Sequence, residues 1–166
     1  DGIFITHTHM DHSPAAVSLA KLTGAPTYGM GPIERGLSGQ TTEAIDPDFV
    51  PDHILRDGDL IAGGECRLQA VHTPGHFPNH LCLWAEELGT LFSGDHVMGW
   101  STTAIVPPLG NLTDYMASKP RALCAAHQGC FSGALSEASA AALISHPTTK
   151  PCFLRSSIPA RTALRI

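Results

Sequence analysis

IFITHTHMDH, residues 3–12, is the stretch of sequence around which the rest of the chain is organised. It places three imidazoles and one carboxylate within six positions, directly after the apolar run Ile3-Phe4-Ile5. If this run forms a strand that continues to His9, then His7 and His9 leave the same face, because side chains alternate along a strand. Two imidazoles on one face can bind one cation, so the sequence predicts a metal site here.

The chain is expected to turn directly after this strand. Ser13-Pro14 predicts the start of a helix, with Ser13 as the N-cap and Pro14 at the first helical position. Asp11 and His12 follow the end of the strand, and we expect them to point toward a second cation. Imidazole and carboxylate ligands without thiolate suit zinc, manganese or iron. A loop that opens onto solvent leaves room for a bound water, which is typical of a catalytic site rather than a structural one.

Two further motifs accompany the first, His72-Thr73-Pro74-Gly75-His76 and Ser93-Gly94-Asp95-His96. Together with residues 6–12 they make the chain resemble the metallo-β-lactamase-fold hydrolases, in the lactamase-beta-2-like branch near the glyoxalase-II-type thioesterases. The resemblance covers residues 1 to about 118. It implies an α/β fold, an αββα sandwich with the metals at one edge between its two sheets, with the N-terminal strands missing and the C-terminal part atypical.

The resemblance also implies a ligand set drawn from all three motifs. The first metal would be bound by His7, His9 and His76, the second by Asp11 and His12, and Asp95 would bridge the two. Asp11 is in addition the expected catalytic residue, because it could take a proton from the attacking water or pass one to the leaving group. Either His72 or His80 could orient a ligand or be a half-buried imidazole, and a structural role is expected for His96.

This ligand set predicts hydrolytic chemistry. Two cations can share a water, and zinc lowers the pKa of a bound water to about 7, which makes hydroxide available as a nucleophile. We therefore expect a dinuclear zinc-dependent hydrolase that uses a metal-bound hydroxide on a small-molecule thioester, ester, lactone or lactam. Two zinc ions are the expected cofactor, with one metal ion, or iron or manganese, as alternatives. The alternative functions are a metal-dependent RNA phosphodiesterase, an iron persulfide-type dioxygenase and an inactive fragment.

The charge is divided unevenly along the chain. Residues 1–118 carry four basic side chains against fourteen acidic ones, a net of −10, whereas residues 119–166 have a net of +5. Nucleic-acid affinity depends on clustered Lys and Arg, so a nucleic-acid partner is possible but not favoured. The sequence says nothing about the oligomeric state.

Cysteine usage and hydropathy bear on localisation. The five cysteines include no CxxC pair, which indicates neither a disulfide framework nor a thiolate zinc site. No stretch approaches the roughly 18 apolar residues of a membrane span. We expect a cytoplasmic protein without a membrane partner; a signal peptide would have stood in the part of the N-terminus that we expect to be missing.

Patterning between the motifs predicts the remaining elements. Residues 14–23 are expected to form a helix with an apolar stripe of Val17, Leu19, Ala20 and Leu22, ended by Gly24. We expect four further elements: a strand over residues 26–30, a long loop over 31–53 that is suited to a substrate wall, a β-meander from Ile54 to Phe92, and a strand over 101–106.

The last part of the chain departs from the family pattern. A helix is expected from Asn111 or Thr113 through Met116, interrupted at Lys119-Pro120. We therefore divide the chain into a metal-binding part of the domain, residues 1–118, and an atypical tail, residues 119–166. The family supplies a last metal histidine in this region, and the nearest candidate is His127, whose surroundings do not match the family's turn; we assign neither His127 nor His146 as a ligand.

Overall fold

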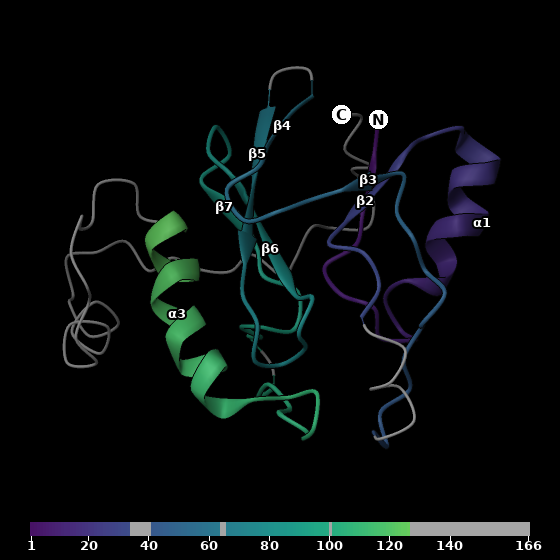
Figure 1. The fold of residues 1–166 in the computed structure, drawn as a ribbon. Coiled ribbons are helices and arrows are strands. Elements are labelled where there is room, and N and C mark those ends of the chain that lie inside the picture. The colour runs from purple at the N-terminus through teal and green to yellow at the C-terminus, as the bar shows by residue number, and fades with distance from the viewer. Residues whose placement is uncertain (34–40, 64–65, 100, 127–166) are drawn as a thin grey trace.

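The chain folds into two facing sheets, each covered by a helix on its outer side (Figure 1). The computed structural model describes residues 1–33, 41–63, 66–99 and 101–126. The first sheet is parallel, in the order β1 (Ile3–Phe4), β2 (Thr27–Gly29) and β3 (His53–Ile54). The second is antiparallel, in the order β4 (Leu60–Gly63), β5 (Cys66–His72), β6 (Leu81–Ala85) and β7 (Thr90–Phe92). The αββα layering that the resemblance implies is confirmed, and so is the predicted meander from Leu60 to Phe92. Its expected start at Ile54 is wrong, because Ile54 pairs with Gly29 in the parallel sheet.

The main apolar core lies between the sheets. Leu81 and Leu83 of β6 pack there with Ala70 of β5 and Leu55, and Phe4 and other partly buried side chains of the first sheet close the cluster. Strand β6 is buried along its whole length because the first sheet covers one face and helix α3 the other. This core fixes the distance between the two sheets.

Helix α1 (Pro14–Thr23) begins and ends where the sequence predicts. Pro14 is its first residue, and Gly24 ends it at φ 73°, with its N–H bonded to the Ala20 carbonyl. The predicted apolar stripe is wrong: Ala16 is the buried side chain of the helix, whereas Leu22 is 83% exposed. The reason is that the helix contacts the first sheet through Ala16, which packs against Ile5 and Phe49.

The first strand is shorter than predicted. Strand β1 ends at Phe4 and does not continue through His9. The Ile5 N–H still donates to Tyr28 of the first sheet, but the Thr6 carbonyl accepts the N–H of Leu81 in the second sheet at 2.7 Å. The chain thus leaves one sheet for the other at Thr6, and this crossing carries the histidine motif into the space between them.

Two expectations for residues 101–126 are also wrong. Residues 101–106 form no strand and are attached to a neighbouring loop through side chains; the Thr103 hydroxyl, for example, donates to the Asp95 carbonyl at 2.8 Å. Helix α3 (Leu112–Ala126) continues through Pro120. Contacts on both sides of the proline hold the helix in place: Ser118 donates to the Pro74 carbonyl, and Ala122 is fully buried against Val71 and Cys82.

The division at residue 118 stays a prediction, and α3 contains residues from both sides of it. His127 and His146 lie outside the described residues. Among the helices of the described ranges, none is both long enough and apolar enough to cross a membrane.

Candidate metal centre

Two sharp turns of the second sheet deliver side chains to the region beside the histidine motif. The β5–β6 loop carries His76 after Gly75, whose φ of 130° and contact with the Tyr115 backbone leave no room for a side chain. The segment after β7 carries Asp95 after Gly94, at φ 49° against His80 and Thr6. In both turns glycine lets the backbone turn where a larger residue would collide.

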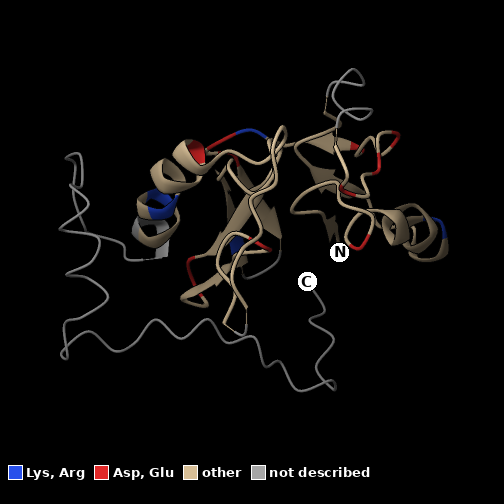
Figure 2. Ribbon diagram, turned by 90° about the horizontal axis from the view of Figure 1, so that it is seen from below, with Lys and Arg blue, Asp and Glu red and all other residues tan. Residues whose placement is uncertain are grey.

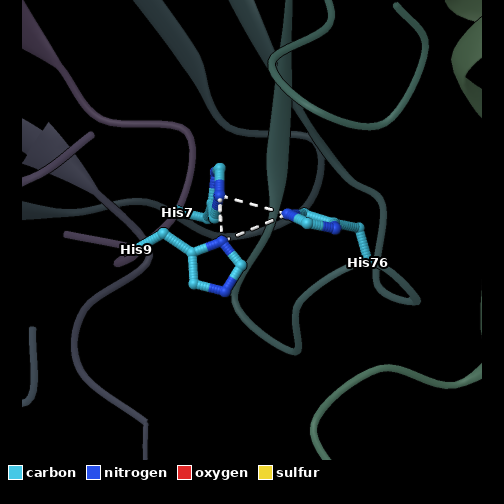
Figure 3. Close-up of side chains that lie close together, drawn as sticks. All are labelled: His7, His9 and His76. Atoms are coloured by element: carbon cyan, nitrogen blue, oxygen red, sulfur yellow. Dashed lines mark hydrogen bonds between the residues drawn. The ribbon is translucent and has the colours of Figure 1, made fainter. Parts of the chain in front are cut away.

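Three imidazoles converge at the end of the first motif, as Figure 3 shows. His7 Nε2 lies 2.9 Å from His9 Nδ1, and His76 Nε2 lies 3.3 Å from His7 Nε2 and 3.2 Å from His9 Nδ1. All three side chains are buried. The predicted convergence of these three histidines is therefore present, although His9 reaches it from a turn with an isolated bridge to Ile45 rather than from a strand.

The hydrogen bonds around this triad suit a cation. His76 Nδ1 lies 2.6 Å from the Ala104 carbonyl, which can only accept, so Nδ1 holds the proton and Nε2 presents a lone pair. His9 Nε2 faces a carboxylate oxygen of Glu43 at 3.5 Å, and a proton on Nε2 would leave the lone pair on Nδ1. His7 Nδ1 lies 3.1 Å from the Thr6 hydroxyl and can hold its proton there. Three lone pairs then meet at one point, which is the donor set that zinc or iron requires.

Burial keeps these imidazoles neutral. Desolvation, followed by the nearby His80, lowers the pKa of His7 far below its usual range. Desolvation, followed by His76, lowers the pKa of His9 to about 4. A neutral imidazole is the form that ligates a metal, so both side chains are ready for a cation at neutral pH.

A second group of potential ligands shares His7 with the triad and adds His12 and Asp95. Asp95 reaches both groups, because one carboxylate oxygen lies 3.5 Å from His12 Nε2 and the other 3.7 Å from His76 Nε2. The contact with Asp95 raises the pKa of His12, and His12 in turn lowers the pKa of Asp95. This position suits the predicted bridging role, which stays a prediction.

Asp11 lies at the edge of the site. Its carboxylate is 3.7 Å from His12 Nε2, and its side chain is 80% exposed. It borders an open cavity of about 440 Å³, lined by His9, Met10, Asp11, Glu43 and Ala44. The structure thus places Asp11 at the solvent-exposed edge of this cavity, and its assignment as a ligand and proton carrier stays a prediction.

The other histidines differ in their relation to the site. His80 is fully buried; its Nδ1 faces the Thr73 hydroxyl at 2.8 Å, and its Nε2 accepts the Asp95 N–H at 3.2 Å, so it orients the Asp95 backbone. His72 bonds instead to the Pro78 carbonyl, away from both groups. His96 is fully buried beside Tyr115, neither of its ring nitrogens has a hydrogen-bond partner among the described residues, and its structural role stays a prediction.

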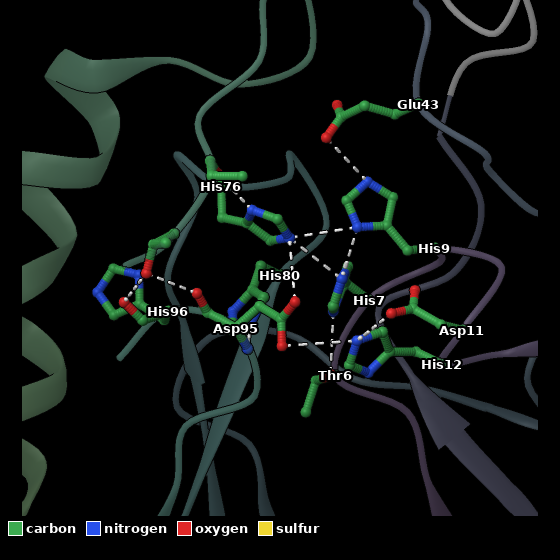
Figure 4. A network of polar contacts seen from close by, with 12 residues as sticks. Thr6, His7, His9, Asp11, His12, Glu43, His76, His80, Asp95 and His96 are labelled. Atoms are coloured by element: carbon green, nitrogen blue, oxygen red, sulfur yellow. Dashed lines mark hydrogen bonds and ion pairs between the residues drawn. The ribbon is translucent and has the colours of Figure 1, made fainter. Parts of the chain in front are cut away.

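Sequence reasoning missed three neighbours of the triad. Phe77 is fully buried and packs on the rings of His7 and His9. Asn79 donates to the Thr8 hydroxyl and the Gly31 carbonyl. Glu43 lies beside His9 in a loop without a motif (Figure 4). The turn-and-loop composition of residues 31–53 suggested a substrate wall, but no residue spacing singled out Glu43.

The chain is similar to several known proteins. Atrochrysone carboxyl ACP thioesterase AgnL7 of Paecilomyces divaricatus is 30% identical over 62% of this chain and 29% of its own length. A hydroxyacylglutathione hydrolase of Rhodobacter capsulatus is 33% identical over 59% of this chain and 34% of its own. The solved structure of TTHA1623 in a di-iron-bound form is similar at a TM-score of 0.58 and 28% identity, covering 74% of this chain and 63% of that one.

The chain thus spans about a third of the length of the two named relatives, both of which are hydrolases. The family profile of the metallo-beta-lactamase superfamily matches residues 1–124, which include both ligand groups and most of α3. The resemblance inferred from the three motifs is confirmed: the chain belongs to the metallo-beta-lactamase superfamily.

Proposed function

We propose that this chain is the metal-binding part of a dinuclear, zinc-dependent hydrolase that acts on a small-molecule thioester. The observation that carries the proposal is the convergence of His7, His9 and His76, next to a second group that shares His7. Among the substrates that the ligand set allows, the thioester is favoured because one relative is named a thioesterase and the other a hydroxyacylglutathione hydrolase.

Residues of the chain would divide the chemistry among them. The triad would hold one zinc ion and His12 with Asp11 the other, with Asp95 between them; bound zinc would lower the pKa of a water and polarise the substrate carbonyl. Water oxygen adds to the acyl carbon, the carbon–sulfur bond breaks, and the thiolate leaves. Asp11, exposed at the cavity mouth, would accept the proton of the water and return it to the leaving thiolate.

The RNA phosphodiesterase alternative is not favoured. In the described part of the chain the five basic side chains are spread over the fold (Figure 2): Lys21 lies on α1, Arg56 between β3 and β4, Arg67 on β5, and Lys119 and Arg121 on α3. A nucleic-acid surface needs such charges gathered along one face. The two acidic side chains that line the cavity, Asp11 and Glu43, would repel a phosphate backbone.

The identity of the metal decides between hydrolase and dioxygenase. Imidazole and carboxylate ligands accept iron as well as zinc, and TTHA1623 was solved with two iron ions. A single iron would support the persulfide-type dioxygenase.

A cytoplasmic location also stays a prediction, and it rests on the cysteine pattern, in which Cys66 and Cys82 are free thiols.

The decisive experiment combines metal analysis with a thioester assay. The purified chain is analysed for zinc, iron and manganese per mole of protein, and thiol release is followed from acyl-glutathione and acyl-coenzyme A thioesters. His76→Ala removes a triad ligand, and His53→Ala, an exposed histidine on β3 outside both groups, is the matched control. About two zinc ions, with thiol release lost in His76→Ala and kept in His53→Ala, would support the proposal.

Other results would contradict it. One iron ion per chain with no thiol release would favour the dioxygenase. Hydrolysis of a lactam or lactone without thioester hydrolysis would replace the substrate class. A chain without stoichiometric metal would be the inactive fragment.

A further inference from the structure

The loop that follows residue 40 is attached to the histidine motif by several hydrogen bonds. The Met10 N–H donates to the Ala44 carbonyl at 3.0 Å, and the Asp46 N–H donates to the Thr8 carbonyl at 2.8 Å. The Ser13 hydroxyl, at the start of α1, donates to the Asp46 carboxylate at 2.7 Å. These bonds fix residues 44–46 against the turn that carries His9, so Glu43 is held at a defined position beside it.

Glu43 approaches His9 from the side opposite to the triad. Its Oε1 lies 3.5 Å from His9 Nε2, whereas His9 Nδ1 faces His7 and His76 (Figure 4). Only 14% of the Glu43 side chain and 10% of the His9 side chain are exposed. A carboxylate held in such a place loses much of its hydration, and it is retained at low free-energy cost when it accepts a hydrogen bond and faces a positive charge.

We propose that Glu43 is the positioning residue of the first metal site, where its carboxylate accepts a hydrogen bond from the His9 Nε2–H group and so aims the lone pair of His9 Nδ1 at the metal. The inference rests on the proposed metal site and adds a residue to it. Metal-bound histidines commonly donate their second ring N–H to a carboxylate, which fixes the tautomer and makes the ligating nitrogen more basic. Closure of the 3.5 Å contact by a few tenths of an ångström would bring it within hydrogen-bond range.

Glu43 differs in this respect from the other carboxylates near the site. Asp95 faces the ligating nitrogens themselves, and Asp11 is exposed at the mouth of the cavity. Glu43 lies next to His9 Nε2, the ring nitrogen that does not face the triad. It therefore acts through His9 and is not assigned as a ligand.

The test measures zinc affinity rather than activity. The dissociation constant for zinc is determined by competition with a chromophoric chelator for the wild type, Glu43→Ala and Glu43→Gln. Glu86→Gln is the matched control, because Glu86 is an exposed carboxylate paired with Arg67 at the far end of the second sheet. We expect Glu43→Ala to lose about 10- to 100-fold in affinity, Glu43→Gln to lose less because it keeps an acceptor oxygen, and Glu86→Gln to bind like the wild type.

A second measurement reads the tautomer directly. In the metal-free wild type, nitrogen-15 NMR of the histidine rings should show the proton of His9 on Nε2, and Glu43→Ala should show a mixture of both tautomers. Thermal unfolding of the metal-free variants checks that they fold.

The outcomes separate this inference from the proposed function. A wild type that takes up no stoichiometric zinc overturns the metal site, and the role of Glu43 with it. A wild type that binds zinc, together with a Glu43→Ala variant of equal affinity, overturns only the role of Glu43. Protonation of His9 on Nδ1 in the wild type would overturn it as well.

Discussion

The two sheets contribute to the metal centre in different ways. The first sheet is parallel, its strands are two or three residues long, and the motif that follows β1 supplies His7, His9 and His12. The second is an antiparallel meander with strands of up to seven residues, and its turns supply His76 and Asp95. Neither sheet holds a complete group of ligands, so the site depends on how the two sheets pack against each other.

The two sheets also differ strongly in how far their strands are buried. Every residue of β6 is buried, whereas both residues of β3 are exposed. The second sheet should therefore hold most of the stability of the chain, and the first should be positioned by it. This difference predicts which substitutions affect metal binding and which affect folding.

The largest effect on zinc binding is expected for His76, the ligand that the second sheet contributes to the triad. His76→Ala removes the ligand that the second sheet gives to the triad and should weaken zinc binding there by at least about 100-fold, with loss of thiol release. His12→Ala should leave the triad intact, so the chain would keep about one zinc ion. Equilibrium dialysis with elemental analysis measures both. Two zinc ions retained by His76→Ala would mean that the first metal site does not need the histidine of the second sheet.

The next effect separates the sheets by stability. Leu81→Ala on β6 opens a cavity in the core between the sheets and should lower the free energy of unfolding by about 2–5 kcal/mol. Ile54→Ala on β3, where the side chain is 59% exposed, should change it by about 0.5 kcal/mol or less. Urea unfolding of the metal-free chain measures the two. Equal losses would mean that the sheets share the stability evenly.

The same contrast explains what the sequence could predict. The meander follows from short-range signals, because turn residues separate runs of strand-forming residues, and its hairpins pair neighbours along the chain. The end of β1 could not be predicted, because it is set by the bond between Thr6 and Leu81, which lie far apart in the sequence. The continuation of α3 past Pro120 likewise depends on tertiary contacts of Ser118 and Ala122.

Within the site, spacing identified the residues whose type alone points to metal. His7, His9 and His76 converge as predicted, and His12 and Asp95 lie beside them. Residue type could not identify Glu43, because a single glutamate in a loop is most often solvated. Its position beside His9 follows from backbone bonds between residues 44–46 and the motif, which leave no trace in the pattern of residue types.

An effect of comparable size, spread over both sheets, is a loss of stability in acid. His9 and the fully buried His96 have a pKa of about 4, each mainly because of burial. In the unfolded chain they bind protons below about pH 6.5, so between pH 6.5 and 4 the unfolded state holds more protons and the folded state loses stability as the pH falls. For His96 the loss is on the order of 3 kcal/mol.

Two other groups modify this pH profile. His12, with a raised pKa, acts in the opposite direction: its contribution is present at acid pH and is lost as the pH rises through its folded value. Asp95, with a lowered pKa, adds stability that is lost only at lower pH, as its carboxylate is protonated. Urea midpoints of the metal-free chain at pH 7 and pH 5 give the net sign, and His96→Leu should flatten the profile. A free energy of unfolding that rises from pH 7 to pH 5 would contradict the conclusion that buried, neutral His9 and His96 dominate the pH profile.

The smallest effect tests whether α3 merely covers the second sheet. Arg121 of α3 pairs with Asp57, in the turn before β4, and both side chains are about half exposed. Solvent weakens such a pair, so Arg121→Ala should cost about 0.2–1 kcal/mol in urea unfolding and leave zinc affinity unchanged. The matched variant Arg67→Ala breaks exposed pairs with Glu86 and Glu87 within the sheet itself and should cost a similar amount. If Arg121→Ala lowered the free energy of unfolding nearly as much as Leu81→Ala, the second sheet would need α3 in order to stay folded. The stability attributed to that sheet would then belong to the sheet and α3 together.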